Sequence, residues 1–411
     1  MIRKRFLRKA VILMAVAMMT LTGCKKEANN EITEQPTTTE SQNETTTKAE
    51  ETTSTQEETT EKESKIEKPD TEPVDNGFPT LESDTSLIPK GETVRSFLTG
   101  EWMNDTVAYR RPLAVMINNI EGALPQRGIS EADIIYEGQC EGNVTRLMAV
   151  FQDYDNVDTL GSIRSCRDYF PWLAAECDAA YFHFGQSDFA LEFLDDPLLM
   201  TFNGMTGEYN FDRRSDRVSP HNVFTSPENL VTAMVNGGVS TYLDEGATSV
   251  FPFTESDERI ECTGDDAQEC YTLNTGYGYN NASFVFNEED GLYYRYEYGQ
   301  PQVDEKTGEQ IAVDNVLLKL VPGDRYWNDS PLYILTGEGL GLLVTNGTAS
   351  WVRWSKEAQG LNTNLGCNYY YGYDATTYSY FDGRPVEFNQ GTTWVCIVEQ
   401  QNQANIEIIG K

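Results

Sequence analysis

The chain has 411 residues and a formal net charge of -34 at neutral pH, from 65 acidic and 31 basic side chains. The phosphate backbone of nucleic acids repels so acidic a protein, and we expect no nucleic-acid partner. The chain has only two histidines, and its eight cysteines lack the spacing of a zinc site. We therefore expect no transition-metal centre and no cofactor.

Residues 1–24 have the pattern of a lipoprotein signal peptide. Basic residues precede an apolar run of about a dozen residues, which is too short to span a bilayer. The run ends in Leu21-Thr22-Gly23-Cys24, which resembles the lipobox of bacterial lipoproteins. We therefore expect Cys24 to carry the lipid that anchors the protein to the outer face of the cell membrane. An ordinary secretory signal with a chance cysteine is the alternative.

Residues 25–100 are rich in Thr, Glu, Ser and Gln. Such a segment buries too little apolar surface to offset the entropy of ordering it. We expect a disordered tether between the lipid anchor and the folded part of the chain.

The stretch 101–245 alternates strand and helix patterns, which predicts an α/β domain with a mixed sheet flanked by helices. The predicted strands are 112–117, 133–138, 145–151 and 179–185, and the predicted helices are 167–177 and 227–237. The second helix has a cap signal at Ser226, followed by Pro227 at the first helical position.

A linker rich in Gly, Asp and Glu is expected at 246–281, followed by a β-rich domain at 282–402. Short aromatic and β-branched runs separated by Gly, Asn and Asp predict a mostly antiparallel sheet there. Most of its tryptophans should be core, although some could form a stacking platform for sugar rings; they include Trp327, Trp351, Trp354 and Trp394. A local disulfide between Cys262 and Cys270 is left open.

Arginine is concentrated in one part of the chain. Of the 18 basic residues after residue 100, nine lie between Arg110 and Arg217, and all nine are arginines. Arginine binds carboxylates and phosphates through two parallel hydrogen bonds. The abundant Asp and Glu side chains could instead neutralise these arginines in an internal ion network, and both interpretations stay open.

The stretch "GSIRSCRDYF" at 161–170 is the first candidate site. If a helix begins there, Ser165 is its N-cap and Asp168 its third residue, with Arg164 and Arg167 on either side. The free amide groups of a helix start would then favour an anion. Cys166 is expected to be a buried side chain rather than a nucleophile.

Two further polar segments contain the histidines. One is "YFHFGQSD" with His183, and the other is "FDRRSDRVSPHNVF" with Arg213, Arg214, Arg217, His221 and Asn222. Either imidazole, paired with a carboxylate, could serve a hydrolase. The pair Glu137 and Glu141 suggests a glycosidase. On a continuous strand, however, they would stand about 13 Å apart, which exceeds the carboxyl separation in either glycosidase class.

Several longer motifs resemble those of the YerB-type lipoproteins of Gram-positive bacteria, a family with two domains of unknown function (3048). The resemblance rests on "RPLAVMINN", "PQRGISEADIIYE", "EGNVTRLMAVF", "GSIRSCRDYF", "HFGQS" and "SPHNVF", and continues more weakly in "WVRWSK" and "GTTWVCIV". It implies an α/β domain followed by a β-rich domain on a lipoprotein, and it supplies no activity.

The leading hypothesis is an extracytoplasmic lipoprotein that binds an anionic or glycan ligand of the cell envelope, or acts as a scaffold. A hydrolase of cell-wall material that uses His221 or His183 is the alternative, so enzymatic activity is left open, as are protein partners. The candidate ligand-binding residues are Glu137, Arg146, Arg164, Ser165, Arg167, His183, Arg217, His221 and Asn222.

Overall fold

The computed structural model describes residue 87, residues 89–206 and residues 209–411. The expected signal peptide, Cys24 and most of the expected tether lie outside the described residues. Within the described part of the chain, no helix is both long enough and apolar enough to cross a membrane.

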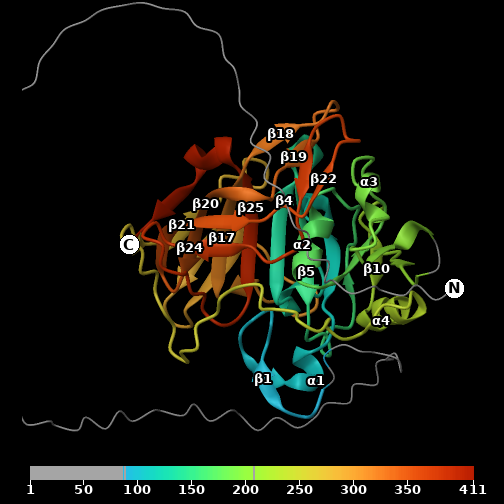
Figure 1. Cartoon of the computed structure of the whole chain (residues 1–411), viewed down its shortest axis with the longest axis horizontal. Helices are drawn as coiled ribbons and strands as arrows, with labels where there is room; N and C mark the ends of the chain where they lie inside the picture. The colour runs from blue at the N-terminus through green and yellow to red at the C-terminus, as the bar shows by residue number, and fades with distance from the viewer. Residues whose placement is uncertain (1–86, 88, 207–208) are drawn as a thin grey trace, which may run out of the picture. The chain divides into compact units, whose positions relative to one another are not determined.

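An eleven-stranded sheet forms the centre of the fold (Figure 1). In sheet order its strands are β11 (Gln268–Glu269), β21 (Thr348–Lys356), β20 (Gly337–Thr345), β17 (Asn315–Val321), β25 (Thr393–Glu399), β4 (Ile134–Gln139), β5 (Thr145–Phe151), β3 (Leu113–Asn118), β7 (Ala180–His183) and β8 (Thr201–Asn203), and β24 (Thr377–Ser379) pairs with β21. Strands from both halves of the chain therefore belong to one sheet.

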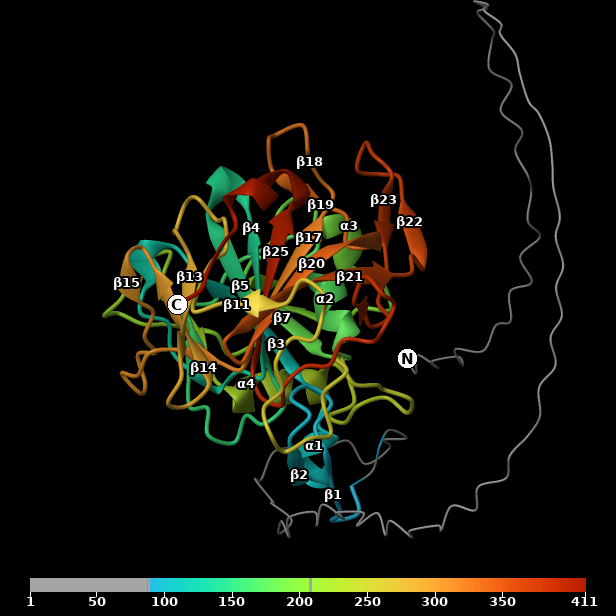
Figure 2. The same ribbon diagram turned by 90° about the vertical axis from the view of Figure 1, so that its left-hand side faces the viewer.

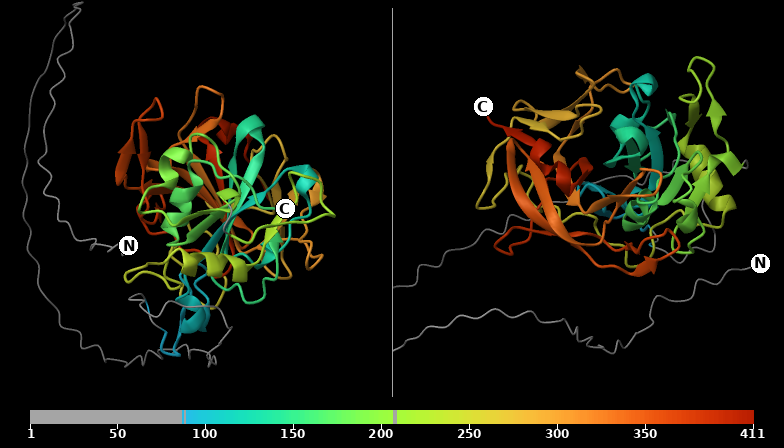
Figure 3. Two further views of the ribbon diagram at one scale, coloured as in Figure 1. Left: turned by 90° about the vertical axis from the view of Figure 1, so that its right-hand side faces the viewer. Right: turned by 90° about the horizontal axis from the view of Figure 1, so that it is seen from above.

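The two halves meet where β25 runs parallel to β4, with Thr393 opposite Ile134. On its other side β25 is parallel to β17. Figure 3 shows the orange and red strands of the C-terminal half in the same body as the teal strands of the N-terminal half. The last long strand of the chain thus fills the central position between the predicted domains.

The sequences of the central strands explain their place in the sheet. β5 reads TRLMAVF and is buried along its whole length, and β3 reads LAVMIN and is equally buried. Continuous apolar runs of this kind are typical of strands that are covered on both faces. The predicted strand at 145–151 coincides with β5.

The N-terminal region is a mixed sheet, as predicted, and it has few helices. β3, β7 and β8 are parallel neighbours, whereas β5 is antiparallel to both β3 and β4. The helices are α1 (Asp105–Ala108), α2 (Phe170–Glu176), α3 (Leu191–Leu194) and α4 (Pro227–Asn236). α4 begins as predicted, because the Ser226 side chain accepts a hydrogen bond from the Asn229 amide.

The C-terminal region consists mostly of antiparallel strands, as predicted, with the β17–β25 pair as a parallel exception. A six-stranded sheet contains β15 (Gln300–Pro301), β14 (Leu292–Glu297), β13 (Ser283–Asn287), β12 (Thr272–Asn274), β26 (Glu407–Ile409) and β16 (Ala312–Val313). Figure 2 shows β13, β14 and β15 to one side of the central strands. The stretch 246–281, expected as a linker, contributes β11 and β12 to the two sheets.

Smaller pairings complete the fold. They are β1 (Thr93–Arg95) with β2 (Trp102–Asn104), β10 (Val223–Thr225) between β6 (Leu160–Gly161) and β9 (Asp212–Arg213), β18 (Gly323–Arg325) with β19 (Pro331–Tyr333), and β22 (Gly360–Asn362) with β23 (Tyr369–Tyr371).

The hydrophobic core lies on both faces of the central sheet. Leu230 and Met234 of α4, and Phe284 and Tyr293 of the six-stranded sheet, pack in one core cluster. Phe170 of α2 packs in the cluster that contains the alternate residues of the same strands. Each central strand therefore buries both of its faces.

The seven described cysteines are free thiols, and all except Cys367 are buried. Cys262 and Cys270 are among them, so the local disulfide that the sequence left open is not formed in the structure.

Candidate functional site

The candidate site lies at the edge of the sheet where three parallel strands end. β3, β4 and β7 run in one direction and end at Asn118, Gln139 and His183. The β18–β19 hairpin lies at the top of Figure 1, and α1, which precedes β3, lies at the bottom. In open α/β sheets, ligands favour the crevice at the carboxyl ends of the strands.

The predicted helix start at Ser165 is wrong. α2 begins five residues later at Phe170, and its N-cap, Tyr169, makes no side-chain cap hydrogen bond. The backbone around Ser165 is extended instead and forms strand-like hydrogen bonds. The Arg164 amide donates to Met116 O at 2.9 Å, and the Cys166 amide donates to Gly185 O at 2.9 Å. A cationic site here depends on side chains and not on a helix terminus.

Three guanidinium groups gather beside this extended segment, and we call Arg146, Arg164 and Arg167 the arginine cluster. Arg146 Nη1 donates to the carbonyl oxygen of Ser165 at 2.8 Å. Arg167 Nη1 donates to the same carbonyl at 3.4 Å and to Cys166 O at 2.8 Å. Side chains from β5 and from the segment before α2 therefore meet at one backbone position.

The members of the arginine cluster differ in how they are neutralised. Arg167 forms an ion pair with Glu141 of η3 (Glu141–Asn143), with an N–O separation of 2.5 Å. No carboxylate of the described residues lies within ion-pair distance of Arg146 or Arg164. The Nε atoms of both side chains are buried and lack a hydrogen-bond partner among the described residues.

This arrangement is electrostatically unfavourable without a counter-ion. Arg146 is only 7% exposed. Its burial, together with the neighbouring Arg167, lowers the pKa of the Arg146 guanidinium. Burial and the charges of Arg146 and Arg167 likewise lower the pKa of Arg164. A buried charge without a partner destabilises a fold, so this site favours an anion that supplies the missing contacts.

Polar side chains from the "SPHNVF" segment lie at the rim of the arginine cluster. His221 Nδ1 is 2.7 Å from Asn118 Nδ2 at the end of β3. Partial burial, and secondarily the charge of Arg164, lower the pKa of His221. The imidazole therefore remains neutral at physiological pH.

Arg213 is a further cation without a carboxylate partner among the described residues. Its Nη1 donates to Asn222 Oδ1 at 2.9 Å, and its guanidinium carbon lies 5.2 Å from the centroid of the Phe184 ring. The Phe184 amide donates to Arg164 O at 2.9 Å. Asn222 and Arg213 are thus connected to the arginine cluster through the segment that follows β7.

His183 lies inside the edge of the sheet and not on its surface. The residue is 1% exposed, and its Nδ1 is 2.7 Å from Gly185 O. Burial lowers the pKa of His183 to about 4. No carboxylate of the described residues contacts either His183 or His221, so the imidazole–carboxylate pair that the hydrolase alternative needs is not assembled there.

Glu137 and Arg217 lie outside the arginine cluster. Glu137 is fully buried and pairs with Arg295 of β14 at 2.8 Å. Arg217 pairs with Glu305 at 2.8 Å and donates to the carbonyl oxygen of Pro125 at 2.9 Å. The two ion pairs, Glu137–Arg295 and Arg217–Glu305, join the N-terminal half of the chain to the C-terminal half.

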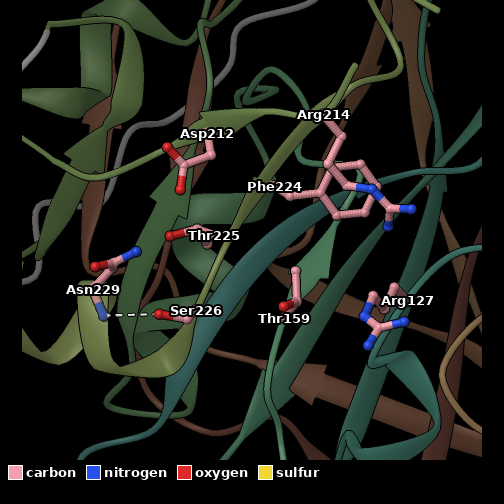
Figure 4. Close-up of a pocket in the computed structure, with 8 residues that line it drawn as sticks. All are labelled: Arg127, Thr159, Asp212, Arg214, Phe224, Thr225, Ser226 and Asn229. Carbon is pink, nitrogen blue, oxygen red and sulfur yellow. Dashed lines mark hydrogen bonds between the residues drawn. The ribbon is translucent and has the colours of Figure 1, made fainter. Parts of the chain in front are cut away.

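Other arginines line a separate cleft of about 510 Å³ at the start of α4 (Figure 4). It is lined by Arg127, Thr159, Asp212, Arg214, Phe224, Thr225, Ser226 and Asn229. Arg127 pairs with Asp158 at 2.7 Å, and Arg214 pairs with both Asp216 and Glu305. These cations are already neutralised, which leaves less charge for a ligand than at the arginine cluster.

The described side chains favour neither thiol chemistry nor a metal site at this edge. Burial raises the pKa of Cys166 to about 12, which keeps the thiol protonated at neutral pH. Among the described residues, no three His, Cys, Asp or Glu side chains are grouped so that they could hold a metal ion.

Sequence reasoning missed some residues of the site. Asn118 lies in the motif "RPLAVMINN", but nothing in the sequence indicated that it would meet His221. Arg213 stands in the segment that drew attention to His221, yet its charge could not be distinguished from that of Arg214 next to it. Ion pairing in the structure distinguishes the two arginines, because only Arg214 pairs with carboxylates of the described residues.

Family models match both halves of this architecture. Residues 98–240 match the N-terminal domain, and residues 272–368 the C-terminal domain, of a family described as "Protein of unknown function (DUF3048)". The chain belongs to the DUF3048 family. It is 30% identical over 315 residues to a Bacillus subtilis protein named as a lipoprotein, YerB, covering 75% of this chain and 87% of that protein.

A solved structure has the same fold. The crystal structure of YerB from Bacillus subtilis aligns with a TM-score of 0.65 at 26% identity, covering 77% of this chain and 99% of that one. The resemblance that the sequence motifs indicated is confirmed. A lipoprotein relative is consistent with a membrane-anchored, extracytoplasmic location for this DUF3048 protein.

Proposed function

We propose that this DUF3048 protein is a lipid-anchored receptor that binds an anionic ligand of the cell envelope at the arginine cluster. Arg146 and Arg164 hold the anionic group, and Arg213, His221 and Asn222 border it. Arg167 and Ser165 position the cluster, because Glu141 occupies Arg167 and the Ser165 carbonyl accepts from Arg146 and Arg167.

The observation that carries the proposal is the missing counter-charge. After residue 100 the chain has 47 acidic and 18 basic side chains, yet no carboxylate of the described residues reaches Arg146 or Arg164. In so acidic a protein, nearby carboxylates would readily pair with a cation that served only the fold, as they do with Arg110 and Arg111. Their absence leaves the hydrogen-bonding capacity of two guanidinium groups for a ligand.

Binding of small probe anions to Arg164→Ala tests this function. We expect pyrophosphate and citrate to bind the full-length protein in detergent, as measured by calorimetry. Since a hydrogen bond to a charged group contributes about 1.5–3 kcal/mol, the variant should bind them about 10- to 100-fold more weakly.

Arg214→Ala is the matched control, because it removes an arginine that Asp216 and Glu305 already neutralise. It should retain the affinity of the parent protein. Equal affinity of the parent protein and Arg164→Ala would refute the proposal. A loss of folding in Arg164→Ala, seen as a lowered unfolding temperature, would identify the arginine as structural.

The anchor itself rests on the sequence and on the lipoprotein relative. In this proposal Cys24 receives the lipid after the signal peptide is removed, and the Thr- and Glu-rich segment that follows it acts as the tether. Two acyl chains bind a bilayer stably, because each buried methylene contributes about 0.8 kcal/mol. Cys24→Ala should therefore abolish the incorporation of labelled palmitate and move the protein from the membrane fraction; retention in the membrane with no label would contradict this anchor.

A further inference from the structure

Trp327 is the most exposed large hydrophobic side chain among the described residues, at 83%. It lies in the turn between β18 and β19, which pair antiparallel. Within this turn the Tyr326 amide donates to Ser330 O at 2.9 Å, and the Asp329 amide donates to Tyr326 O at 2.9 Å. The indole is therefore presented to solvent on a hydrogen-bonded turn.

An aromatic base supports this turn. Tyr326 stacks on Phe189 with a centroid separation of 3.7 Å and an interplanar angle of 8°. The Trp327 ring contacts the same Phe189 edge to face at 6.1 Å. Phe189 therefore supports the turn beneath the indole, while most of the indole surface stays accessible to solvent.

Side-chain contacts connect the turn to the arginine cluster. Ser330 Oγ donates to Glu141 Oε1 at 3.3 Å, and the other oxygen of Glu141 pairs with Arg167. The Tyr326 hydroxyl donates to Asp168 Oδ2 at 2.8 Å, next to Arg167 in the chain. The turn that carries the indole, from the C-terminal half of the chain, thus adjoins Arg167 of the arginine cluster.

The polar surroundings of the indole restrict its partner. Asn328 and Asp329 beside it are exposed, as is Asp324 of β18. The Asp329 carboxylate, two residues after Trp327, disfavours an anionic bilayer, and an apolar protein partner would need a contiguous apolar patch. A sugar ring fits this arrangement, because its C–H face packs on an aromatic ring while its hydroxyls bond to the amide and carboxylate oxygens.

We infer that the ligand of the arginine cluster is an anionic glycan, with a sugar ring stacked on Trp327 and a carboxylate or phosphate group at Arg146 and Arg164. This inference rests on the proposed function and names its ligand class. Each half of the chain contributes one part of the recognition, so neither charge nor sugar alone satisfies the site.

Four probes separate the two parts of the site in the full-length protein. Pyrophosphate carries charge without a sugar, and the N-acetylglucosamine tetramer carries sugar without charge. A tetrasaccharide of alternating N-acetylglucosamine and N-acetylmuramic acid carries sugars with carboxylates, and N-acetylglucosamine 1-phosphate carries a sugar with phosphate. The last two should bind more tightly than the first two, and the stronger of them identifies the anion.

Trp327→Ala is the decisive variant. We expect it to weaken the binding of the charged sugars about threefold to tenfold, as for other aromatic contacts, and to leave pyrophosphate binding unchanged. Arg164→Ala should weaken the binding of all charged probes. Phe381→Ala is the control, because it removes another exposed ring, 49% exposed, that contacts Arg353 of β21. It should bind every probe as the parent does.

Two results would overturn the inference, and they differ in what they leave standing. If Trp327→Ala binds charged sugars like the parent protein while Arg164→Ala does not, the glycan platform is refuted and the anion site survives. If Arg164→Ala also binds every charged probe like the parent protein, both proposals fail. Trp327→Phe should restore most of the affinity for charged sugars; no restoration counts against stacking.

Discussion

Glu297 shares the interior of the protein with Glu137. Asn280 Nδ2 lies 3.1 Å from Glu137 Oε1 and 3.1 Å from Glu297 Oε2, and Asn119 Nδ2 lies 2.9 Å from the latter. Arg295 pairs with Glu137 Oε2. One buried cation thus faces two buried carboxyl groups, and protonation of one carboxyl group balances the charge.

Burial, and secondarily the charge of Glu137, raise the pKa of Glu297 to about 7, whereas Arg295 opposes this shift. The folded protein therefore keeps a proton on Glu297 between about pH 4.5 and 7 that the unfolded chain releases. Because the folded state binds more protons in this window, the free energy of unfolding falls as the pH rises through it.

Glu297→Gln removes this titration. Relative to the parent protein, the variant should gain on the order of 3 kcal/mol of unfolding free energy between pH 4.5 and 7.5, and the difference should be constant above that range. Urea unfolding at a series of pH values measures it. Glu121→Gln, which changes an exposed carboxylate, should follow the parent curve. If Glu297→Gln also parallels the parent curve, Glu297 does not titrate in this window.

β25 is the element that makes the two halves of the chain one fold. It is buried throughout, and it bonds to β17 on one edge and to β4 on the other. The Tyr277 hydroxyl adds a second connection, because it lies 3.0 Å from Glu137 O in β4 and 2.9 Å from Ile397 O in β25. Without β25, β4 would become an exposed apolar edge strand.

A fragment of residues 87–245 should therefore not fold alone, although it contains the whole match to the N-terminal family domain. It loses β25 beside β4, and it loses Arg295, which leaves the buried Glu137 unpaired. Circular dichroism and amide exchange should show an unfolded or aggregating chain, and co-expression with residues 246–411 should restore protected amides in β4. Cooperative unfolding of the isolated fragment would show that the N-terminal half is an independent domain.

Elements that depend on local sequence patterns form where they were predicted. β5 and α4 are set by local patterns, namely a continuous apolar run and a Ser-Pro cap, and both form where predicted. The conformation at Ser165, where a helix start was predicted, is instead determined by contacts with distant residues. The backbone hydrogen bonds of this segment to Met116 and Gly185 keep it extended despite its capping pattern. Neither partner is identifiable in a single sequence.

At the scale of the whole molecule, composition indicated the acidity of the protein and the concentration of its arginines. It could not show which arginines would remain without a carboxylate, because neutralisation depends on contacts across long stretches of chain. Glu305 illustrates this: it lies in the C-terminal half and pairs with both Arg214 and Arg217. Of the predicted site, the structure brings Arg146, Arg164, Ser165 and Arg167 together, with His221 at their rim.

The central position of β25 also sets the order of events during synthesis. A ribosome releases residues 393–399 after all the other strands of the sheet, so the emerging polypeptide lacks the strand that completes its middle. Until then, β4 and β17 have no common neighbour, and the central sheet stays incomplete. Completion of the sheet then coincides with the arrival of its last strand, and neither half of the chain can complete it alone.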